Sequence, residues 1–330
     1  MPARERAAAA EALPLLIRRW AGPHPHTARV PRWTRLTLQL GHRLPLLPDN
    51  LFGHLVATAV PGVEEWRDGA YRCTLRLPGG PGIAALRPAL PGASSVRATL
   101  HLADPADADA AVAVCRRILD LDADPAAIDA DLGRDPVLAP LVAAAPGRRV
   151  PGTADTEQFA VRAVLGQQVS TAAARTHAAR LVAAHGDPVE DPGGGLTHLF
   201  PRPARLAAMD PGLLALPGAR RAAVLGLVRA LADGRVDLSP GADPTTAATR
   251  LAALPGIGPW TVGSIAMRAL GDGDAFLAGD LGVRLAARKL GLPSTPGALT
   301  RRAEAWRPWR AYAVQHLWAT GDHPINRMPS

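Results

Sequence analysis

The chain has 330 residues, of which 48% are hydrophobic and 20% are charged, and its formal net charge is +8 at pH 7. This length and composition exclude a disordered chain and predict two or three compact units with a sizeable hydrophobic core. The excess of positive charge favours a polyanionic partner.

Cysteine content and hydropathy exclude further classes of protein. Two cysteines, Cys73 and Cys115, cannot by themselves hold a tetrahedral metal or an iron–sulfur cluster, so they are expected to be buried thiols and no redox cofactor is expected. No apolar run approaches the ~18 residues of a membrane span, and the run at 13–17 is too short for a signal peptide. We therefore expect a soluble cytoplasmic protein without a membrane partner.

Residues 1–32 predict an N-terminal extension. An alanine-rich helical run at 3–20 is followed by prolines at positions 23, 25 and 31, which end the helix. The extension is an arm that contacts a partner, the remnant of a fused upstream module, or a surface helix with a tether. The usual mobility of chain ends favours the last interpretation.

Residues 33–109 predict a small α+β domain. Alternating apolar and polar residues indicate half-buried strands at 35–40, 71–77 and 95–102. An apolar run at 51–60 predicts a helix, and the glycine- and proline-rich stretch 78–82 predicts a turn between strands. Short strands of this kind favour an antiparallel sheet.

Residues 110–330 predict a mostly α-helical region. Helical periodicity covers 110–121, 125–132, 137–144, 156–185, 203–214, 219–232, 245–253, 260–270, 281–290 and 301–318. Residues 166–170 are expected to break the long run 156–185 into two helices, and 187–197 to form a surface loop.

A short motif dominates the helical region. Residues 254–261 read LPGIGPWT, a tight turn between two predicted helices. Gly256 and Gly258 let the backbone approach another surface closely, and the amides at the start of the next helix have no intrahelical acceptor. Such a turn is a ready binding site for a phosphate. An aspartate, Asp280, follows twenty residues after Trp260.

The motif and three further segments resemble the helix-hairpin-helix DNA glycosylases, specifically the bacterial 3-methyladenine DNA glycosylase II type. These segments are 159–170 (FAVRAVLGQQVS), 274–280 (DAFLAGD) and 301–318 (RRAEAWRPWRAYAVQHLW), and the resemblance covers residues 34–322. One departure is the loop before Asp280, which lacks the usual proline. The resemblance implies a monomeric, nucleoid-associated enzyme of base excision repair that binds double-stranded DNA and releases alkylated purines. It also implies that the sheet domain is a scaffold away from the chemistry.

The resemblance assigns catalysis to Asp280. A carboxylate beside the anomeric carbon stabilises the positive charge that develops on the sugar as the glycosidic bond breaks, and it can orient the attacking water. The alternative is that Asp280 only caps the helix that begins at Leu281. Asp272 and Asp274 are competing acids in the same loop.

The resemblance places four residues in a base pocket: Trp260, Ser264, Leu281 and Trp318. Trp260 occupies the position at which related enzymes with strand-nicking activity carry a Schiff-base lysine, which implies a glycosylase without lyase activity. The rings of Trp260 and Trp318 are expected to attract a cationic base. The alternative for Trp318 is a place in the core, because it follows Trp306, Trp309 and Tyr312 at near-helical spacing. Ser264 and Leu281 replace aromatic residues, so one wall of the pocket is expected to be open.

Further residues are assigned to DNA contacts. The amides of Leu254, Gly256, Gly258 and Trp260 are expected to meet phosphates. Gln168 is expected to fill the gap left by a flipped nucleotide, although Gln167 and Gln168 could instead cap the broken helix. No cofactor is required, but in relatives a monovalent cation (Na⁺ or K⁺) lies beneath the turn, and the matching carbonyls belong to Ala252, Leu254 and Ile257.

Two alternative functions stay open. The same fold could act on bulky or oxidised purines, or the chain could be a non-catalytic DNA-binding protein. Asp280 and its complete loop argue against the second alternative, because holding DNA does not require an acid.

Overall fold

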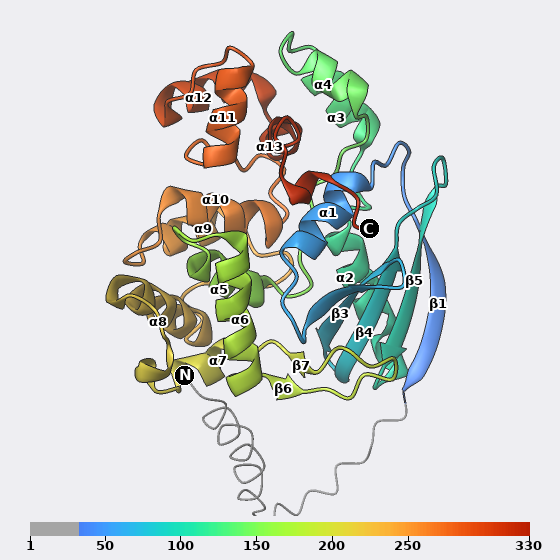
Figure 1. Ribbon diagram of the computed structural model, residues 1–330, viewed down its shortest axis with the longest axis vertical. Helices are drawn as coiled ribbons and strands as arrows, with labels where there is room; N and C mark the ends of the chain where they lie inside the picture. Colours follow the sequence, from blue (N-terminus) through green and yellow to red (C-terminus); the bar gives the residue numbers. More distant parts are fainter. Residues whose placement is uncertain (1–32) are drawn as a thin grey trace, which may run out of the picture. The chain divides into compact units, whose positions relative to one another are not determined.

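The computed structural model of the protein describes residues 33–330, and the helix predicted at 3–20 lies outside the described residues. Strands come first in the described part of the chain, and helices follow (Figure 1). The predicted α+β class, with an N-terminal antiparallel sheet and a mostly helical remainder, is confirmed. None of the helices within 33–330 combines the length and hydropathy needed to cross a bilayer.

The sheet has five antiparallel strands in the order β1-β5-β4-β3-β2. Their bounds are β1 Thr34–Gly41, β2 Glu64–Arg67, β3 Ala70–Leu77, β4 Gly80–Arg87 and β5 Ser95–Leu102. Three of them, β1, β3 and β5, match the predicted strands. The prediction of a turn at 78–82 was too long, because Leu77 already pairs with Gly80 across a two-residue turn and β4 begins there. β2 is only four residues long, which is too short for alternation to reveal it.

Two helices pack on the sheet and close its core: α1 (Asp49–Ala57) and α2 (Ala108–Ile118). Cys73 and Cys115 lie in this core with no exposed surface, as expected. Burial raises the pKa of both thiols, that of Cys115 to about 12. Because α2 shares the core of the sheet, the sheet domain extends past residue 109, the boundary predicted from the sequence.

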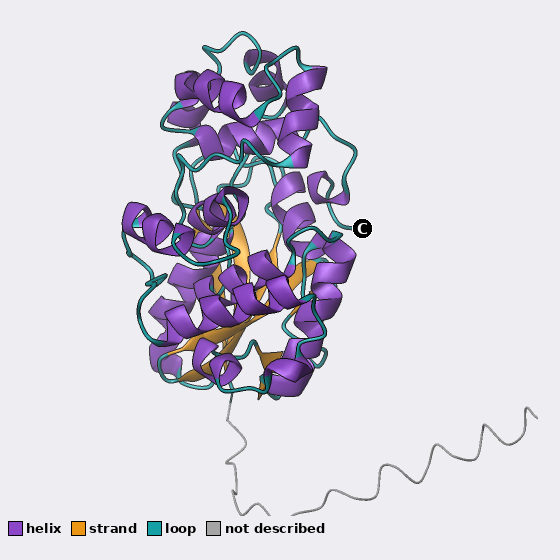
Figure 2. Cartoon of the chain, turned by 90° about the vertical axis from the view of Figure 1, so that its left-hand side faces the viewer, coloured by secondary structure: helices purple, strands orange, loops and turns teal. Residues whose placement is uncertain are grey.

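Helices are the main regular elements of the remaining chain, as Figure 2 shows. Their bounds are α3 Pro125–Leu132, α4 Ala139–Ala144, α5 Thr156–Leu165, α6 Thr171–His185, α7 Pro203–Ala207, α8 Gly218–Ala232, α9 Pro244–Ala252, α10 Pro259–Arg268, α11 Leu281–Lys289, α12 Pro296–Ala303 and α13 Arg310–Trp318. One core gathers around α5 and α8, and a second around α11 and α13.

Proline explains two corrections to the predicted helices. The single helix expected at 301–318 is divided into α12, a 3₁₀ turn η3 (Glu304–Trp306) and α13, with Pro308 in the gap, because proline cannot donate an intrahelical hydrogen bond. The helix expected at 203–214 ends with α7, and a 3₁₀ turn η2 (Pro211–Leu213) follows. The loop expected at 187–197 is flanked by a two-residue strand pair, β6 (Asp187–Pro188) with β7 (His198–Leu199).

The sheet domain and the C-terminal segment are in close contact. Helix α1 packs against the 3₁₀ turn η4 (Pro324–Asn326), and a Cβ atom added at Gly53 would lie 2.8 Å from the carbonyl oxygen of Ile325. A glycine is therefore needed at this position of α1. His54, the next residue of α1, lies beside Arg268 at the end of α10 and Trp318 at the end of α13.

Candidate active site

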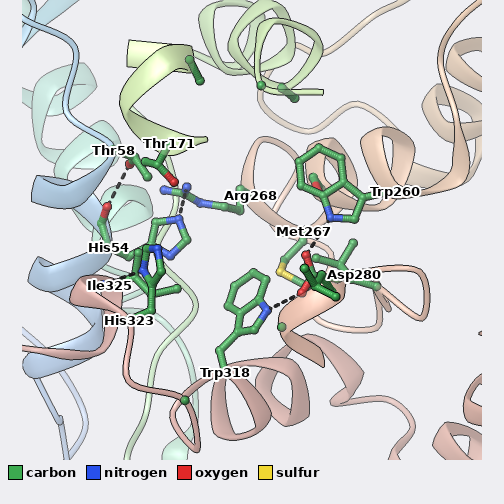
Figure 3. Close-up of a pocket in the computed structure, with 18 of the residues that line it drawn as sticks. His54, Thr58, Thr171, Trp260, Met267, Arg268, Asp280, Trp318, His323 and Ile325 are labelled. Atoms are coloured by element: carbon green, nitrogen blue, oxygen red, sulfur yellow. Dashed lines mark hydrogen bonds between the residues drawn. The ribbon is translucent and has the colours of Figure 1, made fainter. Parts of the chain in front are cut away.

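A cavity of about 690 Å³ lies among α1, α5, α6, α10, α11 and α13 (Figure 3). Asp280 and all four predicted pocket residues, Trp260, Ser264, Leu281 and Trp318, line it. Ser264 is buried in its wall, whereas Leu281 is 68% exposed at its rim. Residues from three separate segments, 260–264, 280–281 and 318, therefore meet at one cavity.

Asp280 is the first residue before α11 and caps that helix, because its Oδ1 accepts the backbone N–H of Val283 at 2.9 Å. The same oxygen accepts the indole N–H of Trp318 at 2.8 Å, and Oδ2 accepts the indole N–H of Trp260 at 2.9 Å. Asp280 therefore both caps α11 and lines the cavity. Three donors on three different segments fix the orientation of the carboxylate. The loop closes without a proline, through a hydrogen bond from the Asp280 N–H to the carbonyl oxygen of Leu277.

The two competing acids face elsewhere. Asp274 forms ion pairs with Arg307 and Arg310, and Asp272 accepts the N–H of Asp274. Neither lines the cavity. Among the three acids of the loop, only Asp280 can meet a molecule bound there.

Trp318 differs from the aromatic residues that precede it. The indoles of Trp306 and Trp309 donate to Asp135 and Asp131, in the core around α13. Trp318 is only partly buried and donates to Asp280. Trp318 therefore packs against this core and also lines the cavity.

The hairpin between α9 and α10 has the expected backbone. Gly256 has a φ of +81°, and a Cβ there would lie 2.7 Å from the Cβ of Ala223, so the position requires glycine. Among the described residues, the amides of Gly256, Gly258 and Trp260 donate to no backbone carbonyl, and those of Gly258 and Trp260 stand at the N-terminus of α10. The amide of Leu254 already donates to the carbonyl oxygen of Leu251. Three of the four amides expected to meet phosphates are thus open to an anion, and that of Leu254 is not.

The loop between α5 and α6 touches this hairpin. Gln167 Nε2 donates to the carbonyl oxygen of Gly256 at 2.9 Å and to Thr261 Oγ1 at 3.0 Å. Ser170, and neither glutamine, caps α6. Gln168 is exposed at the tip with a φ of +56°, a conformation that non-glycine residues rarely adopt. Capping by the glutamines is therefore wrong, and the side chain of Gln168 is presented outward.

The carbonyl oxygens beneath the hairpin suit a cation. Within 33–330, no backbone or side-chain donor reaches the carbonyl oxygens of Ala252 and Ile257, and that of Leu254 accepts only the Ile257 N–H. Oxygen atoms with free lone pairs are the ligands that hard cations prefer. The residues named from the sequence are thus compatible with a monovalent cation.

Sequence reasoning missed the contribution of the sheet domain. His54 and Thr58, from α1 and the residue that follows it, line the cavity with Val60, so this domain does not lie away from the site. The only signal in the sequence was a histidine inside an apolar run. Its partner in space is 214 residues away in the chain, and no pattern in a single sequence reveals such a pair.

That partner is Arg268, at the end of α10. Its guanidinium donates to the carbonyl oxygens of Pro151 and Gly152 at 2.8 and 3.0 Å, and Nη1 lies 2.6 Å from His54 Nε2. Burial, with a smaller contribution from Arg162, lowers the pKa of Arg268 to about 9. Burial also lowers the pKa of His54 well below its usual value, and the charge of Arg268 adds to this effect.

Comparison with known proteins gives consistent results. A family model described as the AlkA N-terminal domain matches residues 37–155. The chain is 35% identical over 277 residues to DNA-3-methyladenine glycosylase 2 of Escherichia coli, covering 82% of this chain and 92% of that protein. It is 57% identical over 294 residues to the probable bifunctional transcriptional activator/DNA repair enzyme AlkA of Mycobacterium tuberculosis, covering 89% of this chain but only 59% of that protein.

A solved structure shares the fold. The 3-methyladenine DNA-glycosylase from Archaeoglobus fulgidus superposes with a TM-score of 0.71 at 19% identity, over 86% of this chain and 97% of that one.

Proposed function

Because the chain belongs to the family of the bacterial DNA-3-methyladenine glycosylase 2, we propose that it is a DNA glycosylase that releases alkylated purines from duplex DNA by hydrolysis. One observation carries this proposal. The carboxylate of Asp280 lies at a cavity of about 690 Å³ and is oriented by the indoles of Trp260 and Trp318.

In the proposed reaction, the damaged nucleotide is rotated out of the duplex into the cavity. As the N-glycosidic bond lengthens, positive charge develops on the sugar, and Asp280 stabilises it. A carboxylate has about four acceptor positions, so three N–H donors leave room for contact with the sugar or with the attacking water. The proton of that water passes to the carboxylate as the new C–O bond forms.

The leaving base needs no general acid. Alkylated purines such as 3-methyladenine and 7-methylguanine carry a positive charge and depart as neutral bases. His54 lines the cavity, but its lowered pKa keeps it neutral at pH 7, so it does not serve as a general acid. A single acid at the site is therefore sufficient for cationic substrates.

DNA is held by the hairpin and the α5–α6 loop. The open amides of Gly256, Gly258 and Trp260 bind phosphates of one strand, without reading sequence. Gln168, at the exposed tip of its loop, fills the space that the extruded nucleotide leaves. A monovalent cation on the carbonyl oxygens of Ala252, Leu254 and Ile257 would keep the turn rigid. The net charge of +8 supports binding to a polyanion.

The enzyme is proposed to lack lyase activity, because a tryptophan cannot form an imine with the sugar. Lys289, the single lysine of the sequence, lies at the rim of the cavity and donates to the carbonyl oxygen of Thr320 at 2.9 Å. Lys289 therefore does not take the position of the Schiff-base lysine of related enzymes, which in this chain is Trp260, in contact with Asp280.

The test uses duplexes that each carry one 7-methylguanine or one hypoxanthine. We expect release of free 7-methylguanine, much slower release of hypoxanthine, which is neutral, and an intact strand that breaks only after heat or alkali. Borohydride in the reaction should trap no protein–DNA adduct. A trapped adduct that disappears in Lys289→Arg would contradict the monofunctional mechanism, and tight binding of DNA without release of any base would support the non-catalytic alternative.

A further inference from the structure

The cavity has a second polar wall that the proposed chemistry does not use. His54 and Arg268 form it, and their exposed fractions are 8% and 7%. Among the described residues, the guanidinium of Arg268 forms hydrogen bonds with two backbone carbonyls and the imidazole but with no carboxylate. It also lies over the ring of Phe159, 4.9 Å from the centroid. A buried cation without an acidic partner is costly, so its role needs an explanation.

The guanidinium determines which nitrogen of His54 carries the proton. An arginine side chain only donates hydrogen bonds, and Arg268 remains charged at neutral pH. His54 Nε2, 2.6 Å from Arg268 Nη1, must therefore accept. The proton of the neutral imidazole then lies on Nδ1. No described residue accepts from Nδ1, and this atom is not among those sealed from solvent. His54 thus presents an N–H donor to the cavity.

Trp318 lies next to both the His54 imidazole and the Asp280 carboxylate. Its indole N–H lies 2.8 Å from Asp280 Oδ1, and its ring centroid is 5.8 Å from that of His54. Figure 3 shows Trp318 between the two residues. An indole and a purine are fused ring systems of similar size. A purine beside Trp318, with its sugar at Asp280, would therefore point its far edge towards His54.

We propose that His54 is a specificity-determining residue, which donates a hydrogen bond from Nδ1 to an acceptor on the far edge of the extruded purine. This proposal rests on the proposed glycosylase function. With Nδ1 opposite position 6 of the purine, the contact favours a carbonyl there, as in 7-methylguanine, over an amino group there, as in 3-methyladenine. Both of these bases are cationic, so charge alone does not separate them. An amino group opposite Nδ1 would leave two donors facing each other without an acceptor.

A purely structural role is the competing explanation, in which His54 only supplies an acceptor for Arg268. Two substitutions separate the roles. The amide of glutamine reaches the position of Nε2, so His54→Gln keeps an acceptor for Arg268 but removes the cavity donor. The amide of asparagine reaches the position of Nδ1, so His54→Asn keeps a donor towards the cavity. His185→Gln, at the C-terminal end of α6 and outside the cavity, is the matched control.

The experiment uses duplex DNA treated with dimethyl sulfate, which carries 7-methylguanine and 3-methyladenine in the same molecules. Single-turnover rates for the two released bases are measured by chromatography for the wild-type protein and the three variants. We expect His54→Gln to lower the ratio of the 7-methylguanine rate to the 3-methyladenine rate by about tenfold, the usual effect of one missing hydrogen bond in a buried site. We expect His54→Asn and His185→Gln to keep the ratio.

The outcomes distinguish the inference from the function on which it rests. Release of both bases with an unchanged ratio in His54→Gln would overturn the role of His54 alone. An equal decrease of the 7-methylguanine to 3-methyladenine rate ratio in His54→Asn and His54→Gln would show a structural role. That result would also overturn the proposed role of His54. If the wild-type protein released neither base, the proposed function would fail together with the inference.

Discussion

At the scale of single residues, the site depends on how one carboxylate is held. Asp280 receives N–H groups from α10, α11 and α13 through Trp260, Val283 and Trp318. The sequence alone favours a role for the two indoles through their ring faces. The structure shows that their N–H groups also orient the carboxylate. The tryptophans therefore have a positioning role in addition to any contact with the base.

This dual role predicts the effect of Trp318→Phe. Phenylalanine keeps an aromatic ring but cannot donate to Asp280 Oδ1, so the carboxylate loses one of its three orienting donors. We expect the single-turnover rate of base release to fall about ten- to a hundredfold, with a small change in DNA affinity. Trp309→Phe, whose indole donates to Asp131 instead, is the matched control. Equal rate losses in the two variants would show a general packing effect.

At the scale of elements, the hairpin between α9 and α10 is built around one glycine. Gly256 has a positive φ and touches Ala223 on α8, whereas a Cβ at Gly258 would meet no atom within 4 Å. The two glycines therefore serve different purposes. Gly256 shapes the turn, and Gly258 keeps the start of α10 accessible.

The prediction for Gly256→Ala follows from this geometry. The turn must shift, which moves the open amides away from a phosphate, and affinity should fall about tenfold for lesion-containing and undamaged duplexes alike. Titrations of both duplexes at several salt concentrations test this. A loss confined to lesion-containing DNA would place the hairpin in the base pocket instead. Gly226→Ala, on α8 with open space around it, controls for the substitution itself.

The sequence reveals elements whose pattern is local. Alternating leucines predicted β1, and the glycines and prolines of 254–260 predicted the hairpin. Pro308 was visible in the sequence, but the spacing of the aromatic residues favoured one continuous helix over the break that the structure shows. Contacts between distant segments were not predictable, since His54 and Arg268 are 214 residues apart in the chain and meet only in the folded protein. The resemblance to a family brought Asp280, Trp260 and Trp318 together, and their hydrogen bonds required the structure.

At the scale of the whole described unit, Asp120 links the sheet domain to α13. Its Oδ2 accepts the N–H of Val150 at 3.1 Å and the hydroxyl of Tyr312 at 3.0 Å. Burial raises the pKa of Asp120 to about 6, despite these hydrogen bonds. The folded protein therefore binds a proton more tightly here than the unfolded chain, and stability is lost as the pH rises from about 4 to about 6.

Asp120→Asn should remove this pH dependence. Asparagine keeps an acceptor, carries no charge and tolerates the φ of +50° at this position. We expect the free energy of unfolding at pH 7.5 to rise in the variant, and its decrease between pH 4 and pH 6 to become smaller. Urea unfolding at several pH values measures both quantities. An unchanged pH profile would show that Asp120 is not buried as a charge.

We propose that the Asp280 carboxylate performs catalysis at a cavity built by two domains. A comparison of Asp280→Asn with Asp243→Asn tests this role directly. Asp280→Asn keeps the side-chain size and the cap of α11 but removes the charge opposite the developing oxocarbenium ion. Asp243→Asn makes the same substitution at the cap of α9, outside the cavity. We expect Asp280→Asn to lower the single-turnover rate of 7-methylguanine release by ~10²–10³ or more. Binding of the lesion-containing duplex should stay largely intact. The Asp243→Asn control should release the base at the wild-type rate. An Asp280→Asn protein that kept most of its single-turnover rate would contradict the account.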